Sequence, residues 1–523
     1  MPSTKSEEKQ DSNKAHHKKK DRAAEIADTF EWLITAFLLA FVFRAFVMEA
    51  FRIPTGSMAD TLKGAHFRLR CAQCGYKYEH GFVPRDYADR NGRTLREDTV
   101  PAWSITPPRT RCPSCGYYEP TPGKVTVANG DRILVLKCIY QFLEPKRWDV
   151  IVFKNPNEPH VNYIKRLAAL PGDSLEIIDG DVYIDGKISR KPPKVQDELW
   201  MPVHDNDYQP VNPSKPAFGS THNRPWRQPF TNTPGSQWVT TDHNSPTLFH
   251  LASPPDRINE IVYDSSIGND FRTAYAYNDV GFYRNMPYCS DLMVRFYSRP
   301  ADVAGTIGIS LSKYETTYKA SVDAAGQMVI AKVSDGAESV LVSEQVEPPA
   351  ADKWTLVRFA NVDHRLTFDF GAKKISYDLG LEPLAAGERK PDIEPKVAIL
   401  GSGKLTLSHM AIFRDIHYTA GRSMNGEDGR ATEGNPFVLK DDEFFVLGDN
   451  SPNSLDARWW ESPGVANNGL YYRPGIVPRD YLVGKALFVY WPGGFKPFAK
   501  FPIAAIPNVG KMRFICGGSN EGP

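Results

Sequence analysis

Residues 163–188 read YIKRLAALPGDSLEIIDGDVYIDGKI, and this stretch predicts the class of the fold. Its apolar residues form short runs, and Asp-Gly pairs stand at 179–180 and 185–186. Asp-Gly is typical of tight hairpin turns, in which both central residues take a positive φ. The stretch therefore predicts short antiparallel strands. Apolar runs at 131–140 and 147–154 (DRILVLKCIY and RWDVIVFK) extend this expectation to a larger sheet.

The composition of the 523-residue chain limits the classes of protein to which it can belong. At ~150 residues per domain, this length predicts about three domains. Apolar residues make up 41% and charged residues 24%, values that exclude a disordered, collagenous or multi-span membrane protein. Lys and Arg number 63 against 62 for Asp and Glu, so the chain lacks the basic excess of a nucleic-acid-binding protein. We therefore expect no nucleic-acid partner.

The N-terminus predicts a membrane anchor. Residues 1–25 form a basic, polar tail, and residues 32–43 (WLITAFLLAFVF) carry no charge. Extended over 26–51, the apolar segment is long enough to span a bilayer, which takes about 20 residues. A cleaved signal peptide is the alternative, but the bulky residues MEAFRIP that follow lack a small-residue cleavage site. By the positive-inside rule we expect a single-pass protein of the inner (cytoplasmic) membrane, with its tail cytoplasmic and the rest extracytoplasmic.

Residues 195–435 predict a separate β domain. After a Pro-rich start, short apolar runs such as DLMVRFYSR (291–299) recur between Gly and Asp turns, a spacing typical of an antiparallel sandwich. The segments 356–379 and 405–419 resemble the strands of concanavalin-like or laminin-G-like jelly rolls. That resemblance implies a glycan or protein ligand. A packing or spacing domain without a ligand is the alternative.

Two Cys-x-x-Cys pairs predict a zinc-ribbon-like insert over residues 68–120. Cys71 and Cys74 form the first pair and Cys112 and Cys115 the second, and each pair is followed by glycine, as in zinc knuckles. Between the pairs lie 37 residues. Four thiolates would close the coordination shell of a structural zinc. Two disulfides are the alternative for a domain outside the cell, and free thiols are a third interpretation.

Three short motifs contain candidate catalytic residues. FRIPTGSMADTL (51–62) places Ser57 in a Pro- and Gly-containing turn directly after the predicted anchor. Lys165 lies among apolar neighbours, where burial would lower its pKa and provide a neutral amine as general base for a serine hydroxyl. A lysine that turns outward to water is the alternative. The third motif, FFVLGDNSPNSLDARWW (444–460), is typical of a turn after a strand, with Asp456 and Arg458 as an ion pair.

In this order, the three motifs resemble those of the bacterial type I signal peptidases. The resemblance covers residues 25–70, 124–193 and 436–492, and RWDVIVFK is similar to the family's Gly-Asp-Val strand, with Trp148 in the glycine position. It implies a mainly β chain with an N-terminal transmembrane helix and a β-barrel catalytic domain. That domain is expected to be discontinuous, over 52–194 and 436–510, and the jelly-roll-like β-sandwich is inserted into it.

The resemblance also implies roles for individual residues. Ser57 corresponds to the nucleophile and Lys165 to the general base of a Ser–Lys pair, a known variant of the serine peptidase triad. Thr55 corresponds to a hydroxyl residue that helps the Ser57 N–H bind the oxyanion. No cofactor is expected for catalysis.

The third motif is expected to support this pair. Ser454 corresponds to the residue that orients the lysine, and Asp456 and Arg458 correspond to a supporting ion pair. Ser451-Pro452 replaces the Arg-Asp that usually follows Gly-Asp-Asn, and no catalytic group is lost by this change.

These features imply a membrane-anchored serine endopeptidase that removes signal peptides from exported preproteins after small, Ala-x-Ala-like residues. Its expected partners are those signal peptides and the lipid bilayer. The alternatives are a surface adaptor or glycan-binding protein that acts through the inserted sandwich, and a related Ser–Lys peptidase dedicated to few substrates. Because long insertions add little loop-closure entropy, we expect the peptidase to stay active when a short linker replaces residues 200–432.

Overall fold

The computed structural model divides the chain into two units, residues 1–49 and 50–523. Strands dominate the described residues, so the mainly β fold class is confirmed. The residues that the structure describes are 22–88, 92–96, 99–101, 103–119, 123–210, 226–242, 244–302, 305–334, 336–419, 428–465, 469, 471–494 and 508–518.

The first unit is a long apolar helix. Helix α1 (Arg22–Val42) continues into the π-helical turn η1 (Phe43–Val47), and 22 residues of it, Ile26–Val47, are long and apolar enough to cross a membrane. Large side chains such as Trp32 and Phe37 are exposed on it, as suits a lipid-facing helix. The helical segment ends at Val47, before the predicted anchor end at residue 51, and strand β1 (Met48–Arg52) follows it. Most of the predicted tail, 1–21, lies outside the described residues.

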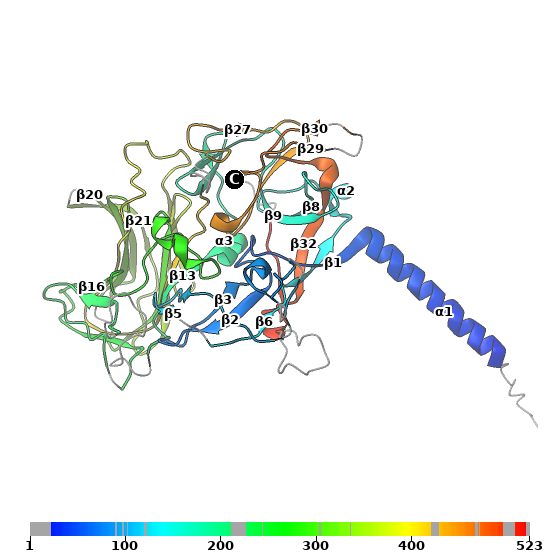
Figure 1. The fold of residues 1–523 in the computed structure, drawn as a ribbon. Helices are drawn as coiled ribbons and strands as arrows, with labels where there is room; N and C mark the ends of the chain where they lie inside the picture. Colours follow the sequence, from blue (N-terminus) through cyan, green and yellow to red (C-terminus); the bar gives the residue numbers. More distant parts are fainter. Residues whose placement is uncertain are drawn as a thin grey trace, which may run out of the picture. The chain divides into compact units, whose positions relative to one another are not determined.

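Residues on both sides of the insertion form one eight-stranded sheet (Figure 1). Its order is β1-β7-β32-β8-β9-β28-β31, and β33 also pairs with β32. The strand bounds are β7 Arg132–Leu136, β8 Val150–Lys154, β9 Asn162–Ala169, β28 Glu443–Leu447, β31 Val477–Pro478, β32 Leu482–Trp491 and β33 Arg513–Phe514. The sheet thus contains strands from both predicted segments, and β33 lies beyond the predicted end at residue 510.

A smaller four-stranded sheet contains the predicted Asp-Gly turns. Its order is β12-β11-β10-β27, with bounds β10 Ser174–Ile178, β11 Asp181–Ile184, β12 Lys187–Ile188 and β27 Phe437–Val438. The turn at 179–180 has φ values of 47° and 87°, and that at 185–186 has 52° and 76°. Both turns therefore have the positive φ pair that was predicted from Asp-Gly.

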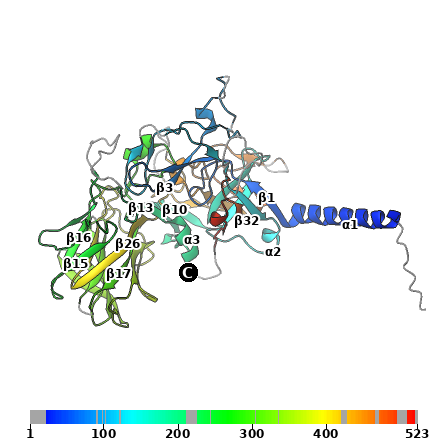
Figure 2. The same cartoon turned by 90° about the horizontal axis from the view of Figure 1, so that it is seen from below.

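The insertion is a sandwich of two seven-stranded sheets, as predicted (Figure 1). One has the order β13-β26-β17-β22-β23-β24 with β15 beside β26, and Figure 2 shows β15, β17 and β26 side by side. The other has the order β14-β16-β25-β18-β19-β20-β21. Aromatic and aliphatic residues of both sheets form one core, which includes Phe249, Phe296, Phe359 and Ile309.

The strands of the sandwich run from residue 201 to residue 414, close to the predicted insertion bounds of 195 and 435. Their bounds are β13 Met201–Asp205, β14 Phe230–Asn232, β15 Phe249–Ala252, β16 Asn259–Tyr263, β17 Leu292–Pro300, β18 Ile307–Lys313, β19 Thr316–Val322, β20 Gln327–Ser334, β21 Ala337–Gln345, β22 Thr355–Val362, β23 Arg365–Phe370, β24 Lys373–Asp378, β25 Val397–Gly401 and β26 Lys404–Arg414.

Short elements complete the described chain. The cysteine insert contains the sheet β3-β2-β6 and the pair β4-β5, and it has its own small core. Its strands are β2 His66–Arg70, β3 Lys77–Gly81, β4 Thr110–Arg111, β5 Tyr118–Glu119 and β6 Val127–Ala128. The remaining elements are α2 Ile139–Phe142, α3 Pro193–Leu199, β29 Gly464–Val465, β30 Tyr471–Tyr472 and the 3₁₀ turns η2 Pro84–Asp86, η3 Val280–Asn285, η4 Ser451–Asn453, η5 Arg479–Tyr481 and η6 Val509–Lys511.

A buried group of charges joins the insertion to the four-stranded sheet. Carboxylate oxygens of four residues lie within 4.8 Å of one another: Asp181 from β11, and Asp291, Asp363 and Asp415 from the insertion. Lys191 pairs with Asp363 and, at 2.9 Å, with Asp415, whereas Lys313 pairs with Asp291. We call these six residues the interface charge cluster. Two ammonium groups thus supply counter-charges among the four carboxylates.

Candidate active site

Ser57 lies in a compact turn that is held by the third motif. The Ala59 N–H donates to the Gly56 carbonyl at 3.0 Å, which closes the turn around the serine. The Asn450 N–H donates to the Ser57 carbonyl at 3.0 Å, and the Asn450 side-chain amide donates to the Gly56 carbonyl, also at 3.0 Å. Ser57 is 9% exposed. Ser57 is therefore nearly buried, and its backbone is held by hydrogen bonds from Asn450, almost 400 residues further along the chain.

Lys165 contacts Ser57 directly. It lies on β9, and its Nζ donates to Ser57 Oγ at 2.6 Å and to the Ile164 carbonyl at 3.2 Å. Only 4% of the residue is exposed, so the alternative of an outward-facing lysine is wrong. Burial lowers the pKa of Lys165 to about 8, although the carboxylates of Asp456 and Asp449 act in the opposite direction. This amine can lose its proton near neutral pH and then accept one from the serine.

Asp456 and Arg458 form the predicted ion pair. Arg458 donates to the two carboxylate oxygens of Asp456 at 2.8 and 2.7 Å, and both side chains are fully buried. The same carboxylate accepts the Gly448 N–H at 2.9 Å, and Arg458 also donates to the Ser451 hydroxyl at 2.8 Å. A bidentate pair of this kind has a well-defined geometry. It therefore fixes the loop that carries Asn450.

Two other predicted residues lie nearby without the contacts that were expected of them. Ser454 is 6% exposed, but within the described part of the chain its hydroxyl has no hydrogen-bond partner, Lys165 included. Thr55 is exposed, two residues before the serine. Their proposed roles in orienting the lysine and binding the oxyanion therefore stay predictions.

Sequence reasoning missed a second buried ion pair. Arg166 donates to both carboxylate oxygens of Asp449 at 2.8 and 2.7 Å, and both side chains are fully buried. Arg166 also donates to the Trp148 carbonyl at 2.9 Å. An arginine within the otherwise apolar run after Lys165 was the available signal, because a buried arginine needs a carboxylate partner. This pair ties β9, which carries the lysine, to the loop after β28.

Trp148 explains the departure from the family's glycine. Its φ is 71°, a left-handed value that glycine adopts freely and that costs most other residues free energy. The tryptophan is 3% exposed and belongs to the catalytic core. Packing of its ring in the core offsets the backbone cost of this conformation.

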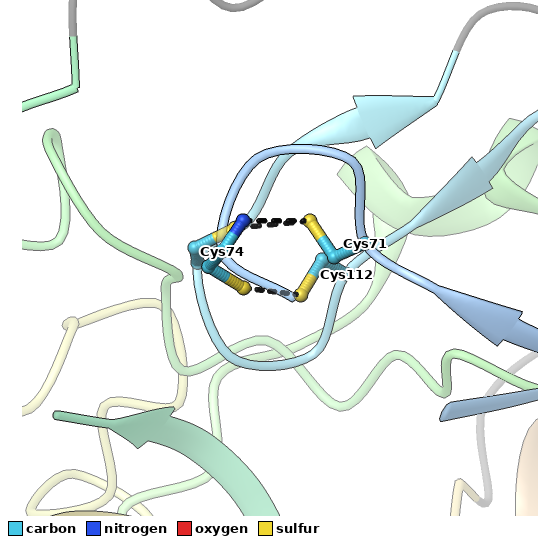
Figure 3. Close-up of side chains that lie close together, drawn as sticks. Cys71, Cys74 and Cys112 are labelled. Carbon is cyan, nitrogen blue, oxygen red and sulfur yellow. Dashed lines mark hydrogen bonds between the residues drawn. The ribbon is translucent and has the colours of Figure 1, made fainter. Parts of the chain in front are cut away.

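The four cysteines of the insert form two matching knuckles whose sulfur atoms converge. Figure 3 shows Cys71, Cys74 and Cys112 of this group. In each knuckle the glycine N–H donates to the carbonyl of the first cysteine at 3.0 Å, and Gly75 and Gly116 have φ values of 77° and 71°. The Sγ atoms of Cys71 and Cys115 are 3.6 Å apart, and those of Cys74 and Cys112 are 3.7 Å apart. In the structure all four are free thiols.

These distances suit a tetrahedral metal site. Zn–S bonds of about 2.3 Å in a tetrahedron place the sulfur atoms about 3.8 Å from one another, whereas a disulfide requires about 2.05 Å. Four convergent thiols are also the donor set that zinc prefers in structural sites. The residues present therefore fit a structural zinc, and a site with four cysteine ligands has no open position for catalysis.

Known proteins resemble the segments that build this site. A family model described as signal peptidase, peptidase S26 matches residues 121–242 and 411–491, which include Lys165 and 454–458 but not Ser57. A signal peptidase I of Rickettsia akari is 29% identical over 163 residues, or 31% of this chain and 44% of that protein. A probable signal peptidase I-2 of Synechocystis is 28% identical over 133 residues, or 22% of this chain and 59% of that protein.

The matched segments thus resemble signal peptidases of the S26 class. Within that class they resemble the bacterial type I enzymes, which confirms the resemblance inferred from the three motifs. The alignment to the first relative spans less than half of that protein. Together with the apolar N-terminal helix, this likeness indicates a membrane-anchored protein.

The solved structures add nothing about the ligand of the insertion. The carbohydrate-binding module CBM66 from Bacillus subtilis shares 11% identity and a TM-score of 0.24 with the chain, over 36% of this chain and 99% of that module. A TM-score this low carries no argument about binding. A glycan or protein ligand of the sandwich therefore stays a prediction.

Proposed function

We propose that this chain is a membrane-anchored serine endopeptidase that cleaves N-terminal signal peptides from exported preproteins after small residues. The observation that carries the proposal is the 2.6 Å contact between Lys165 Nζ and Ser57 Oγ, at a lysine whose pKa burial lowers to about 8. A nucleophile and a general base in hydrogen-bond contact define a serine peptidase site of the Ser–Lys kind. The likeness to type I signal peptidases supports the substrate class.

The proposed reaction follows from these two groups. Neutral Lys165 accepts the Ser57 proton as Oγ attacks the scissile carbonyl carbon, and the resulting ammonium then gives that proton to the leaving amine. The acyl group on Oγ is next attacked by a water molecule, from which Lys165 takes a proton, and Oγ leaves and is reprotonated. The Ser57 N–H and the Thr55 hydroxyl are proposed to stabilise the oxyanion.

The proposed orientation follows from the N-terminal sequence. The basic tail would stay in the cytoplasm and the chain after the helix would lie outside the cytoplasmic membrane, by the positive-inside rule. Ser57 follows the last helical residue, Val47, by only ten positions in the sequence. A signal peptide has its own apolar segment in the bilayer, so its cleavage site would also lie close to the membrane surface. The lipid bilayer and the signal peptide are therefore the proposed partners.

The test is to incubate the purified full-length protein, in lipid vesicles, with a preprotein and to locate the cut by mass spectrometry. We expect one cut after an Ala-x-Ala-like sequence, and no cut with the Ser57→Ala variant. A panel of unrelated preproteins extends the test. Cleavage of only one or two of them would indicate a dedicated peptidase, and cleavage of none would contradict the proposal and leave the surface adaptor.

We further propose that Cys71, Cys74, Cys112 and Cys115 bind one structural zinc. The sulfur distances of 3.6 and 3.7 Å support this proposal. Elemental analysis should find about one zinc per chain, and a chelator or Cys112→Ser should lower the melting temperature. Cys138→Ser, at a half-buried cysteine outside the knuckles, is the control and should retain the metal. Absence of zinc, with a mass lower by four hydrogens, would support two disulfides instead.

A further inference from the structure

One loop of the insertion lies against the catalytic loops. The Tyr275 hydroxyl donates to the Asp449 carbonyl at 2.8 Å, and the Tyr277 hydroxyl donates to the Ala65 carbonyl at 3.2 Å. Both tyrosines are buried, and they share a small core with Ala59, two residues after the serine. Residues 275–278 of the insertion, which we call the docking loop, therefore pack into the catalytic domain rather than only beside it.

The docking loop also contacts the residue before the nucleophile. A Cβ added at Gly56 would lie 2.2 Å from the ring of Tyr277, so the glycine permits an approach that a side chain would prevent. The Tyr277 carbonyl also accepts the Gly81 N–H at 2.9 Å. The turn that carries Ser57 is thus confined on one side by an aromatic ring from the insertion.

Asn278 is linked to the serine through Asn450. The two asparagines exchange hydrogen bonds: the Asn278 amide donates to Asn450 Oδ1 at 2.6 Å, and Asn450 Nδ2 donates to Asn278 Oδ1 at 2.7 Å. Asn450 Nδ2 also donates to the Gly56 carbonyl at 3.0 Å. An amide has one donor end and one acceptor end. By donating to Oδ1, Asn278 therefore keeps the NH₂ group of Asn450 directed at Gly56.

We propose that Asn278 is a positioning residue for Ser57, and that the insertion thereby completes the active site instead of serving as a spacer. This inference rests on the proposed function of the Ser57–Lys165 pair. Nucleophilic catalysis is sensitive to displacements of the order of 1 Å, and a loose Gly56-Ser57 peptide would weaken the alignment of Oγ with Lys165. These contacts argue against the expectation that the peptidase stays active when a linker replaces residues 200–432, because that change would remove the docking loop.

The first test measures kcat and KM of Asn278→Ala in the full-length protein. We expect kcat to fall about tenfold, because both part-buried hydrogen bonds between Asn278 and Asn450 are lost and the Asn450 amide can turn away from Gly56. KM and the melting temperature should change little. Asn450→Ala should lose more. The double variant should be no worse than Asn450→Ala alone, because Asn278 acts through Asn450. Asn244→Ala, an exposed asparagine of the same insertion, is the control and should keep the wild-type kcat.

Two results of that test would overturn the positioning role. One is an unchanged kcat in Asn278→Ala. The other is a double variant whose loss equals the product of the two single losses, because independent effects multiply. A lower melting temperature together with a proportionate loss of active protein would indicate a structural role only, and would also count against the proposal.

The second test needs no substrate and so separates this proposal from the proposed function. In a Ser57→Cys variant the new thiol would lie beside Lys165 and ionise more readily. Its alkylation by iodoacetamide over a range of pH, followed by peptide mass spectrometry, reports that ionisation. Adding Asn278→Ala should move the midpoint to higher pH and slow the reaction at neutral pH several-fold. An unchanged profile overturns the positioning role. If the shift is found but the wild-type protein cleaves no preprotein, the positioning role is supported and only the proposed function is contradicted.

Discussion

Two buried lysine sites in the same molecule shift the pKa of their amines in opposite directions. Lys165 faces the Ser57 hydroxyl and a backbone carbonyl, and among the described residues no carboxylate forms a salt bridge with it. Burial lowers its pKa to about 8. Lys191, in the interface charge cluster, pairs with Asp363 and Asp415. Although burial opposes them, these carboxylates raise its pKa well above the ordinary value.

The difference shows that burial alone does not make a lysine a base. Near Lys165 the carboxylates of Asp449 and Asp456 are each neutralised by an arginine, Arg166 and Arg458, in a fully buried bidentate pair. The lysine is therefore left with neutral partners, and desolvation decides its protonation. In the interface charge cluster the lysines are themselves the counter-ions. The Lys165 site suits the proposed proton transfer, whereas the interface charge cluster pairs charges between the insertion and the four-stranded sheet.

The largest expected effect is on the catalytic pair. Ser57→Ala and Lys165→Met should each lower kcat/KM by at least about 10⁴-fold, because nucleophile and base act as one unit. The melting temperature should hardly change. Lys165 forms no salt bridge among the described residues, so its replacement by methionine leaves no carboxylate without a partner. Cleavage of a fluorogenic signal-peptide substrate measures the first quantity. Substantial activity in either variant would refute the assignment of the pair.

The corresponding change in the charge cluster should act on stability instead. Lys191→Met leaves Asp363 and Asp415 buried without their cation, which we expect to cost about 3–5 kcal/mol of unfolding free energy. Lys319→Met breaks an exposed pair with Glu338 and serves as the control, at less than about 1 kcal/mol. Denaturant unfolding provides the measurement. Equal effects of the two substitutions would contradict the role given to the cluster.

The pH dependence of activity tests the state of Lys165. In the proposed reaction the neutral amine is the active form, so kcat/KM should rise about tenfold per pH unit below the pKa and level off above it. With the pKa lowered to about 8, the midpoint is expected there, well below the ordinary lysine value of 10.5. A midpoint near 10.5 would mean that the lysine is solvated or paired, as in the charge cluster.

The smallest expected effect is that of Ser454→Ala. Lys165 is already held by Ser57 and the Ile164 carbonyl, and the Ser454 hydroxyl has no partner within the described residues. We therefore expect kcat to fall less than about fivefold. Steady-state kinetics with the same substrate measure this loss. A hundredfold loss would instead support the orienting role that the family resemblance implies.

Local sequence was sufficient for some of the site and insufficient for the rest. The Asp-Gly turns, the Cys-x-x-Cys-Gly knuckles and the Asp456–Arg458 pair each depend on residues that lie within a few positions, so their geometry follows from the local chain. Arg166 and Asp449 are separated by 283 residues, and their pairing was missed although Arg166 stands beside Lys165 and Asp449 lies in the third motif. The link between Asn278 and Asn450 spans 172 residues and left no signal in either segment.

By itself, the sequence determined the mainly β class, the apolar helix, the inserted sandwich and the identity of the candidate nucleophile and base, because short-range patterns of apolar residues, turns and motifs carry that information. Only the tertiary structure decided that Lys165 is buried, which lowers its pKa, and which residues the insertion contacts. Both depend on the burial of charges and on contacts between distant segments. The approach of Tyr277 to Gly56 is one such contact. Burial and long-range contacts arise when the sheets pack together, so they cannot be predicted from a local sequence pattern.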